Sequence, residues 1–491
     1  MESDQIDGGN QSSGKKKGVK KSGKDAASSK WNRGRNDLPK VQTNFSAPSQ
    51  FDKSTIISIG PHRWPTVITE SQPEDHTSPV EENRDVQPDN QPPDAAEQTE
   101  KAVYGVPMPR SYLELTLSPK ENEVDHPAAQ SFNSDILLIP DLSTFRTLPW
   151  AEQTARIICD PCTVTGIPLR TSPRLIAKIM LGQLNTMGFS IYSSFTYECC
   201  IFRIPERMDP KNIFFPATTL LSNHDMPFLQ QMVKGLYHIG INVDSFASAS
   251  GPGQMEICFK PKFGIEAADN AFTFRTGVKE MARTHNYIAT FLTDDIIHNS
   301  VCLAHSLWDA DGRDNLFHSG AGEMSEVGKK WLGGLLQHSP ALSCLMAPGL
   351  GCRTHLCKDN KSTFFATCGS NDNSCTFNVK FHGGQNTQIE NRLGSAIANP
   401  YIVMAATIAA GLDGIRSNLC AESRLNRPTV QQKDFAISVK LEDALMALEE
   451  DHVICRALGE PFVRYFIAIK RLEIETQMSD TDRNKNLEYF I

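Results

Sequence analysis

The chain has 491 residues, 40% hydrophobic and 22% charged, so it can bury a large core and has length enough for two to four domains. Its formal net charge of −8 argues against a nucleic acid or an anionic membrane as partner of the whole molecule. The thirteen cysteines follow no framework spacing and the start has no apolar signal segment, so we expect reduced thiols and a cytoplasmic location.

The N-terminal segment, residues 1–101, is rich in Gly, Ser, Lys, Pro and acidic residues without sustained periodicity, which predicts a disordered low-complexity tail. A basic block surrounds Lys15–Lys24, and an acidic block extends over 74–100. The basic block fits a nuclear-import or polyanion-binding patch as well as a solvated tail, and both remain open. We expect trypsin to cut this block quickly and to leave a resistant core that starts near residue 102.

Regular structure is expected from residue 102 onwards. Alternating strands at 113–117 and 135–139 predict a partial N-terminal β-domain over 102–150. Helices and strands then interleave, so 151–491 predict one large domain, and the chain reads as α+β or α/β. The predicted helices cover 172–187, 227–239, 267–285, 325–346, 399–415 and a pair within 441–475. The predicted strands cover 189–202, 254–259, 287–293 and 301–308.

The most specific pattern lies at 388–415. Side chains alternate along a strand, so Gln388, Glu390 and Arg392 share one face, where an acid beside a guanidinium suits a metal together with a carboxylate or phosphate. Asn399 is a predicted N-cap, and the proline after it suits the first helical position. The helix that follows is small and apolar on every side, so we expect it to be buried; it is too short to span a membrane.

Together with the segments 140–150 and 251–257, this stretch resembles type I glutamine synthetases, over roughly residues 103–491. The resemblance implies a glutamine synthetase fold: a β-grasp-like N-terminal domain and a large catalytic-type domain. It also implies divalent metals held by glutamates and a histidine, and hexameric rings stacked as a dodecamer. The N-terminal domain is expected to be truncated, because the low-complexity tail leaves only 102–150 for it.

Carried over position by position, the family's site is incomplete. Glu198, Glu256 and Glu390 stand where the resemblance implies metal-binding glutamates, and Arg392 stands where it implies a substrate-binding arginine. These four residues form either a salt bridge kept for packing or a retained site for an ion or small anion. We expect no catalytic residue and no resident metal or other cofactor, and weak binding of Mg²⁺ or Mn²⁺ stays open.

The other positions of the implied site have changed their chemistry. They are Thr196 and Ala249 in place of glutamates, Cys302 and Ala304 in place of histidines, Asn373 and Asn378 in place of arginines, and 351–355 in place of Asn-Ser-Tyr-Lys-Arg. His305 lies one residue along the strand from Ala304, so it should face the opposite side of the sheet.

These losses and the ending Glu488–Ile491 resemble an eye-lens branch of the family that is enzymatically inactive. That resemblance implies a homo-oligomer that serves as a cytoskeletal or chaperone-like protein in lens fibre cells. Its implied partners are intermediate filament proteins such as vimentin and beaded-filament protein, with no nucleic acid and no membrane span. Two alternatives stay open: a glutamate–ammonia or γ-glutamyl–amine ligase with an altered site, and a sensor of glutamate or nucleotide.

Three weaker patterns are interpreted as structural. Cys159 and Cys162 have redox-motif spacing, but nothing around them supports that chemistry. The acidic run Asp309–Asp314 predicts a hairpin turn rather than a calcium loop, because the distal acid is absent. Histidines without partners in register are expected to be ordinary; they are His318, His338 and His382.

Overall fold

The computed structural model describes residues 55–59, 65–70, 105–110, 135–203, 226–249, 251, 253–293, 298–319, 323–354, 363–383, 386–419 and 435–479. Residues 50–491 form one compact unit. Four sequence features lie outside the described residues: the basic block at 15–24, the acidic block at 74–100, the strand expected at 113–117, and the ending 488–491. No helix among the described residues is long and apolar enough to cross a membrane.

Among the described residues, the N-terminal sheet has six strands in the order β1-β2-β6-β4-β3, with β5 beside β6. Their bounds are β1 Thr55–Ile59, β2 Pro65–Glu70, β3 Val106–Pro109, β4 Asp135–Pro140, β5 Arg146–Thr147 and β6 Thr154–Thr163. A short 3₁₀ helix, η3, spans Leu142–Thr144 after β4. A small core under this sheet is formed by Met108, Ile136, Leu138, Ile157, Cys159 and Leu169.

The hairpin of β1 and β2 corrects one expectation. β1 pairs with β2, and β2 pairs with β6, so a part of the segment 1–101 belongs to the sheet. The prediction of a tail without regular structure is therefore wrong at this hairpin, and the sheet is not confined to 102–150. The signal was present in the sequence, because both short runs are rich in Ile, Val and Thr, which favour strands.

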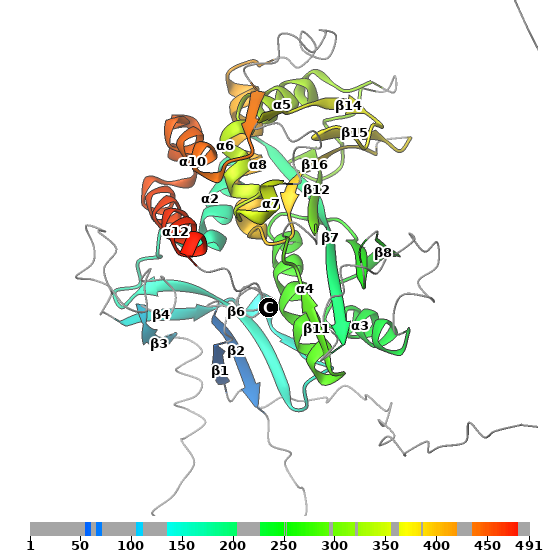
Figure 1. Cartoon of the computed structure of the whole chain (residues 1–491), viewed down its shortest axis with the longest axis vertical. Helices are drawn as coiled ribbons and strands as arrows, with labels where there is room; N and C mark the ends of the chain where they lie inside the picture. The colour runs from blue at the N-terminus through cyan, green and yellow to red at the C-terminus, as the bar shows by residue number, and fades with distance from the viewer. Residues whose placement is uncertain are drawn as a thin grey trace, which may run out of the picture. The chain divides into compact units, whose positions relative to one another are not determined.

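The large sheet has nine strands within the described part of the chain, in the order β14-β15-β16-β12-β7-β9-β8, with β10 and β11 also paired to β7 (Figure 1). Its strands are β7 Phe189–Arg203, β8 Val243–Ser248, β9 Gln254–Phe259, β10 Lys262–Phe263, β11 Tyr287–Thr290, β12 Ser300–Asp309, β14 Cys368–Ser370, β15 Phe377–Phe381 and β16 Thr387–Ser395. The β14–β15 pair is parallel, and the other pairs are antiparallel. A separate pair joins β13 Thr363–Phe365 to β17 Ala436–Ser438.

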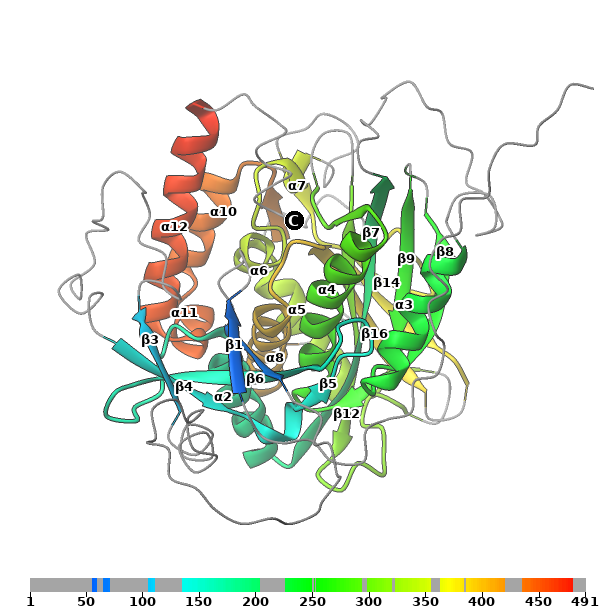
Figure 2. The same ribbon diagram turned by 90° about the horizontal axis from the view of Figure 1, so that it is seen from below.

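Helices pack on one face of the large sheet, the C-terminal ones as an outer layer (Figures 1 and 2). They are α2 Pro173–Thr186, α3 Met226–His238, α4 Glu266–Thr284, α5 Glu326–Gln337, α6 Ser339–Met346, α7 Gly351–Thr354, α8 Pro400–Arg416, α10 Leu441–Glu450, α11 His452–Leu458 and α12 Glu460–Ser479. Figures 1 and 2 both show α8 between the sheet and the C-terminal helices α10 to α12. Helices mixed with largely antiparallel sheets confirm the α+β class.

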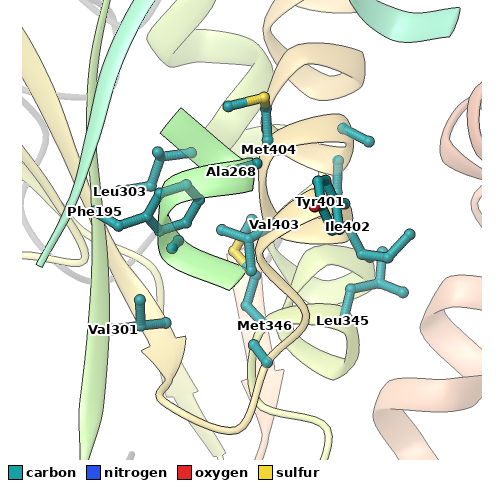
Figure 3. Packing of buried hydrophobic residues seen from close by; sticks show 14 of the residues in the cluster. Phe195, Ala268, Val301, Leu303, Leu345, Met346, Tyr401, Ile402, Val403 and Met404 are labelled. Carbon is teal, nitrogen blue, oxygen red and sulfur yellow. The ribbon is translucent and has the colours of Figure 1, made fainter. Parts of the chain in front are cut away.

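Helix α8 is buried along most of its length, as the sequence predicted. The Asn399 side chain accepts hydrogen bonds from the backbone N–H groups of Tyr401 and Ile402, which fixes the helix start. Figure 3 shows side chains of α8 facing Phe195 and Leu303 of the sheet and Ala268 of α4. These contacts place α8 at the centre of the main hydrophobic core.

Helices α5 and α8 approach each other through glycines. A Cβ atom on Gly411 would lie 2.1 Å from the Trp331 ring, and one on Gly334 would lie 2.0 Å from the Ala410 carbonyl oxygen. Real Cβ contacts are essentially never this short, so the Trp331 ring packs directly on the α8 backbone at Gly411, and the two helix backbones touch at Gly334. Larger residues there would push the two helices apart.

A buried ionic network joins the N-terminal sheet to the helices. Arg174 of α2 binds Asp141 at 2.8 Å, Asp160 at 3.0 Å and Asp269 at 2.8 Å. The Tyr401 hydroxyl donates a further hydrogen bond to Asp269 at 2.7 Å. One guanidinium thus connects the segment after β4, strand β6 and helix α4.

Two long predicted helices are divided in the structure. The segment expected as one helix over 325–346 is split at His338, where Pro340 starts a new helix, α6. The C-terminal pair is three helices, because Asp451 caps α11 and Gly459, with a φ of 90°, ends it.

Candidate functional site

The positions singled out by the resemblance come together on one face of the large sheet. Thr196 of β7 stands opposite Cys302 of β12 on one side and Cys258 of β9 on the other. Glu198 stands opposite Glu256. Alternate residues of these strands face the core, where Phe195, Tyr197, Ile257 and Leu303 are buried.

The same face continues across strands β16 and β15. Glu390 stands opposite Ala304 of β12 and opposite Asn378 of β15. Arg392 lies two residues further along β16, so it shares this face with Glu390. The structure therefore brings Glu198, Glu256, Glu390 and Arg392 onto one surface. Period-two spacing predicted this for Glu390 and Arg392, and the resemblance implied it for Glu198 and Glu256.

Local protein groups hold Glu198 and Glu390. The Glu198 carboxylate accepts a hydrogen bond from the Ser300 backbone N–H at 2.7 Å. Glu390 lies 3.5 Å from the Arg392 guanidinium and accepts a hydrogen bond from the Asn378 amide at 3.2 Å. These carboxylates are thus stabilised without an added cation.

The third carboxylate, that of Glu256, has no comparable stabilisation of its negative charge. Burial raises the pKa of Glu256, and the negative charges of Glu198 and Glu390 raise it further, while Arg392 opposes them. The remaining acids of the face therefore repel one another, and one arginine compensates only in part.

The two cysteines that flank Thr196 are protonated thiols rather than thiolate ligands. Burial and the nearby Glu390 raise the pKa of Cys302 well above its ordinary value. Burial likewise raises the pKa of Cys258, although a hydrogen bond with Thr196 opposes the shift. The sequence pattern did not single out Cys258, yet its place two residues after Glu256 on one strand was the signal that could have found it.

His305 faces the core, as its register predicted. Its Nε2 accepts a hydrogen bond from the Trp331 indole N–H at 3.0 Å. Burial lowers the pKa of His305 to about 4, so the ring is neutral at physiological pH. His305 therefore serves the packing of β12 against α5 and does not reach the candidate site.

The altered arginine positions also serve structure. Asn378 is buried, its Nδ2 donates to the Asn373 side-chain oxygen at 2.9 Å, and its Oδ1 accepts from the Asp372 backbone N–H at 2.9 Å. Arg353, within 351–355, is fully buried and donates to backbone carbonyl oxygens that include Ser343 at 3.0 Å. Its guanidinium donates hydrogen bonds to the ends of helices and strands, so the group is not available to a substrate.

These donors do not fit a pair of divalent metal ions. Mg²⁺ takes six oxygen ligands and is usually held by one or two carboxylates for each ion, together with water and substrate phosphates. Thr196 and Cys302 stand in the row between the carboxylates, and Ala304 stands opposite Glu390. No group of three His, Cys, Asp or Glu side chains in the described part of the chain could hold a metal. Ala249 lies beside the turn formed with Gln254 and offers no side-chain ligand.

That turn itself is well defined. Gly253 has a φ of 59°, and a Cβ there would lie 2.4 Å from the Ile201 carbonyl oxygen, so only glycine fits. The Gln254 side chain donates to the His298 carbonyl oxygen at 2.6 Å and to the Asn299 side chain at 2.9 Å. The scaffold of the site is retained where its ligands have changed.

Two of the weaker sequence motifs, the cysteine pair of β6 and the acidic run after β12, are structural features. Cys159 and Cys162 are both buried on β6, three residues apart and so on opposite faces. The Asp309 carboxylate accepts the backbone N–H of Arg313 at 2.6 Å and of Asp314 at 3.1 Å, which forms the predicted turn after β12. Neither motif offers a ligand site.

Two of the three histidines have modest contacts. His318 lies 3.3 Å from the Thr387 hydroxyl, and His382 lies 3.4 Å from the Gln388 amide. The expectation was wrong for His338, which binds Asp451 at 2.6 Å and Asp413 at 3.0 Å. Its partners lie far along the chain, so no local pattern could reveal them.

Comparisons with known proteins agree with this geometry. Residues 170–489 match the family model described as glutamine synthetase, catalytic domain. Lengsin of Rattus norvegicus is 58% identical over 399 residues, which cover 80% of this chain and 71% of the relative. Lengsin of Homo sapiens is 55% identical over 399 residues, covering 80% of this chain and 78% of the relative.

More distant matches extend the comparison. A glutamine synthetase of Staphylococcus aureus is 27% identical, covering 79% of this chain and 93% of the relative. The solved structure of a novel glutamine synthase homolog superposes with a TM-score of 0.67 at 23% identity, over 80% of this chain and 92% of that chain, and shows the same fold. The chain therefore belongs to the glutamine synthetase family, and within it to the lengsins.

Proposed function

We propose that this protein is a pseudoenzyme: a glutamine synthetase fold that performs no ATP-driven ligation and acts as a structural or chaperone-like protein. One observation carries the proposal. On the face that would have to hold metals and phosphates, Thr196 and Cys302 occupy the row between the Glu198–Glu256 pair and Glu390, and Ala304 stands directly opposite Glu390.

The chemistry of phosphoryl transfer explains why this matters. Catalysis of that reaction depends almost entirely on cations and arginines placed against the charge of the transferring group. Loss of one such group typically costs ~10²–10³ in rate. With Asn373 and Asn378 at the implied arginine positions and Glu390 already paired to Arg392, several such groups are lacking together.

The role we propose in place of catalysis is cytoskeletal. It is assembly as a homo-oligomer and binding to intermediate filament proteins, such as vimentin and beaded-filament protein, in the cytoplasm of lens fibre cells. A ring of subunits offers the same weak contact many times, so effective concentration raises the overall affinity for a filament. The support is the membership among lengsins together with a face unsuited to ligation.

The proposed absence of ATP-driven ligation is tested with the full chain. We expect no ADP release that depends on both ATP and glutamate, in the presence of Mg²⁺ or Mn²⁺ and ammonia. The matched control is Glu390→Ala, which removes the carboxylate that lies 3.5 Å from the Arg392 guanidinium. ADP release that requires both substrates and vanishes in the control would overturn the proposal.

A second candidate function follows from Glu198, Glu256, Glu390 and Arg392, which keep the residue types that the resemblance implies. The Arg392 guanidinium is 40% exposed beside Glu390, so a small carboxylate or phosphate can reach it. Isothermal titration with Mn²⁺, ATP and glutamate distinguishes three functions: a sensor, an altered ligase and a structural protein. Binding without turnover supports a sensor, turnover with an amine in place of ammonia supports an altered ligase, and no binding supports the structural role.

The proposed binding to intermediate filaments is tested by sedimentation with assembled vimentin filaments. We expect the chain to pellet with the filaments, while an active bacterial glutamine synthetase at equal subunit concentration stays in solution. A chain that stays in the supernatant with both vimentin and beaded-filament protein would exclude the proposed partners.

A further inference from the structure

Asn373 lies in an exposed turn between β14 and β15, and two donors hold its side-chain oxygen. That oxygen accepts a hydrogen bond from the Lys380 Nζ at 2.7 Å and another from the Asn378 Nδ2 at 2.9 Å. Donors at such distances stabilise negative charge that develops on a carbonyl oxygen, and one of these two is a cation. The side-chain carbon of Asn373 is therefore polarised for attack by a nucleophile.

The backbone nitrogen that follows Asn373 is paired with a carboxylate. The Ser374 N–H donates to Asp372 Oδ1 at 2.9 Å, and the Ser374 hydroxyl donates to the same oxygen at 2.7 Å. Ser374 precedes strand β15, so its N–H belongs to an Asx turn rather than to the sheet. A carboxylate in this place can take the proton of the nitrogen while the nitrogen forms a new bond.

The dipeptide itself favours the reaction between these two groups. A small residue after asparagine leaves the backbone nitrogen accessible, so that it can attack the preceding side-chain amide. No asparagine of this chain precedes glycine, and serine follows Asn133, Asn299 and Asn373. Asn133 lies outside the described residues, so the structure allows the comparison of Asn299 with Asn373.

We propose that Asn373 is a site of deamidation, promoted by Lys380 and Asp372. The Ser374 nitrogen attacks Asn373 Cγ, an N–C bond forms, and the bond from Cγ to the side-chain nitrogen breaks. Asp372 passes the proton of the backbone nitrogen to the leaving group, which departs as ammonia with the electron pair of the broken bond. Water then opens the succinimide ring at either carbonyl carbon and leaves aspartate or isoaspartate.

The product places a negative charge beside the candidate site. The Asn378 amide that binds Asn373 also donates to Glu390 at 3.2 Å, so a single amide connects residue 373 to that carboxylate. Lys380 stays next to the new carboxylate and balances its charge, and the turn is exposed. We therefore expect the deamidated protein to keep its thermal midpoint. The reaction does not depend on whether the face with Glu390 binds or turns over a substrate.

Asn299 is a reference for this reaction within the same chain. The Ser300 N–H also donates to a carboxylate, that of Glu198, at 2.7 Å. Asn299 is fully buried, its side-chain nitrogen donates to the Leu292 carbonyl oxygen at 2.8 Å, and Ser300 belongs to strand β12. The fold thus keeps water and the attack geometry away from Asn299, whereas it exposes Asn373.

The test incubates the full chain at pH 7.4 and 37 °C in ¹⁸O-labelled water, folded and unfolded in guanidinium chloride, and follows both asparagines by peptide mapping with mass spectrometry. Unfolding separates Asn373 from Lys380 and removes the protection of Asn299. We expect Asn373 to react at least about tenfold faster in the folded chain than in the unfolded chain, and Asn299 to show the opposite order. A folded-chain rate at Asn373 equal to or below the unfolded-chain rate overturns the proposal.

Lys380→Met tests the cation at the side-chain oxygen, and Lys380→Arg is the matched control that keeps a charged donor. We expect Lys380→Met to slow the reaction of Asn373 in the folded chain by about tenfold or more, and Lys380→Arg to keep most of the rate. A slow rate at Asn299 shows that each variant is folded. An unchanged rate at Asn373 in Lys380→Met overturns the assigned role of Lys380. Asn373→Gln should leave the site unmodified, because its longer side chain must close a six-membered ring.

Discussion

Replacement of Arg174 by methionine should destabilise the protein more than any change at a surface ion pair. The variant keeps the length and apolar stem of the side chain but leaves Asp269, whose side chain is 11% exposed, without its cation. Removal of one partner from a buried ion pair typically costs ~3–5 kcal/mol. Lys178 can still bind the other two aspartates, at 3.3 and 2.6 Å, and Tyr401 still donates to Asp269, so we expect the lower end, about 3 kcal/mol.

The measurement is the urea midpoint followed by circular dichroism, with midpoints compared at one protein concentration. The matched control is Arg464→Met, which breaks an ion pair with Glu460 whose side chains are 66% and 70% exposed. Exposed pairs are worth ~0–1 kcal/mol, so the control should hardly shift the midpoint. Arg174→Met combined with Asp269→Asn should recover part of the loss. Equal shifts in Arg174→Met and Arg464→Met would refute the assignment of a buried network.

Four further outcomes are expected. Gly411→Ala places a Cβ 2.1 Å from the Trp331 ring and should lower stability by ~1–3 kcal/mol or more, and an unchanged thermal midpoint would contradict the direct α5–α8 contact. Burial alone would lower the pKa of His338, but Asp451 and then Asp413 outweigh burial and raise the pKa. The stability that the charged ring contributes is therefore full below pH ~6.5 and is lost as pH rises through the folded-state pKa. His338→Gln should thus lower the free energy of unfolding more at pH 6 than at pH 9. Trypsin should cut the basic block at 15–24 and leave a core that still contains the β1–β2 hairpin; a first resistant residue near 102 would argue against that hairpin. Light scattering should report a large closed assembly, and a mass near one 54.4 kDa chain at micromolar concentration would exclude the ring.

The parts of the fold that depend on local pattern could be predicted. Asn399, the proline after it and the apolar run define α8 through capping and composition alone, and its burial is confirmed. The shared face of Glu390 and Arg392 follows from period-two alternation, and so does the opposite orientation of His305.

What the sequence could not predict depends on distant partners. His338 binds carboxylates that lie 75 and 113 residues away, so no local pattern shows that the ring is paired. The hairpin at 55–70 gains its place by pairing with β6, a strand far along the chain, and the low-complexity flanks obscured it. Cys258 lies beside Thr196 only because two strands are in register.

The alternation along β7 separates two kinds of evolutionary constraint. Phe195 and Tyr197 are fully buried in the core, so a change there costs a cavity or a clash, whereas Thr196 and Glu198 on the other face are only partly buried. Substitutions on that face can therefore accumulate one at a time with less cost to the fold. Each lost acid also removes like-charge repulsion, which an empty metal site would otherwise leave uncompensated. A chain of this kind can keep its fold while the chemistry of its second face changes, and its stability then depends less on divalent ions.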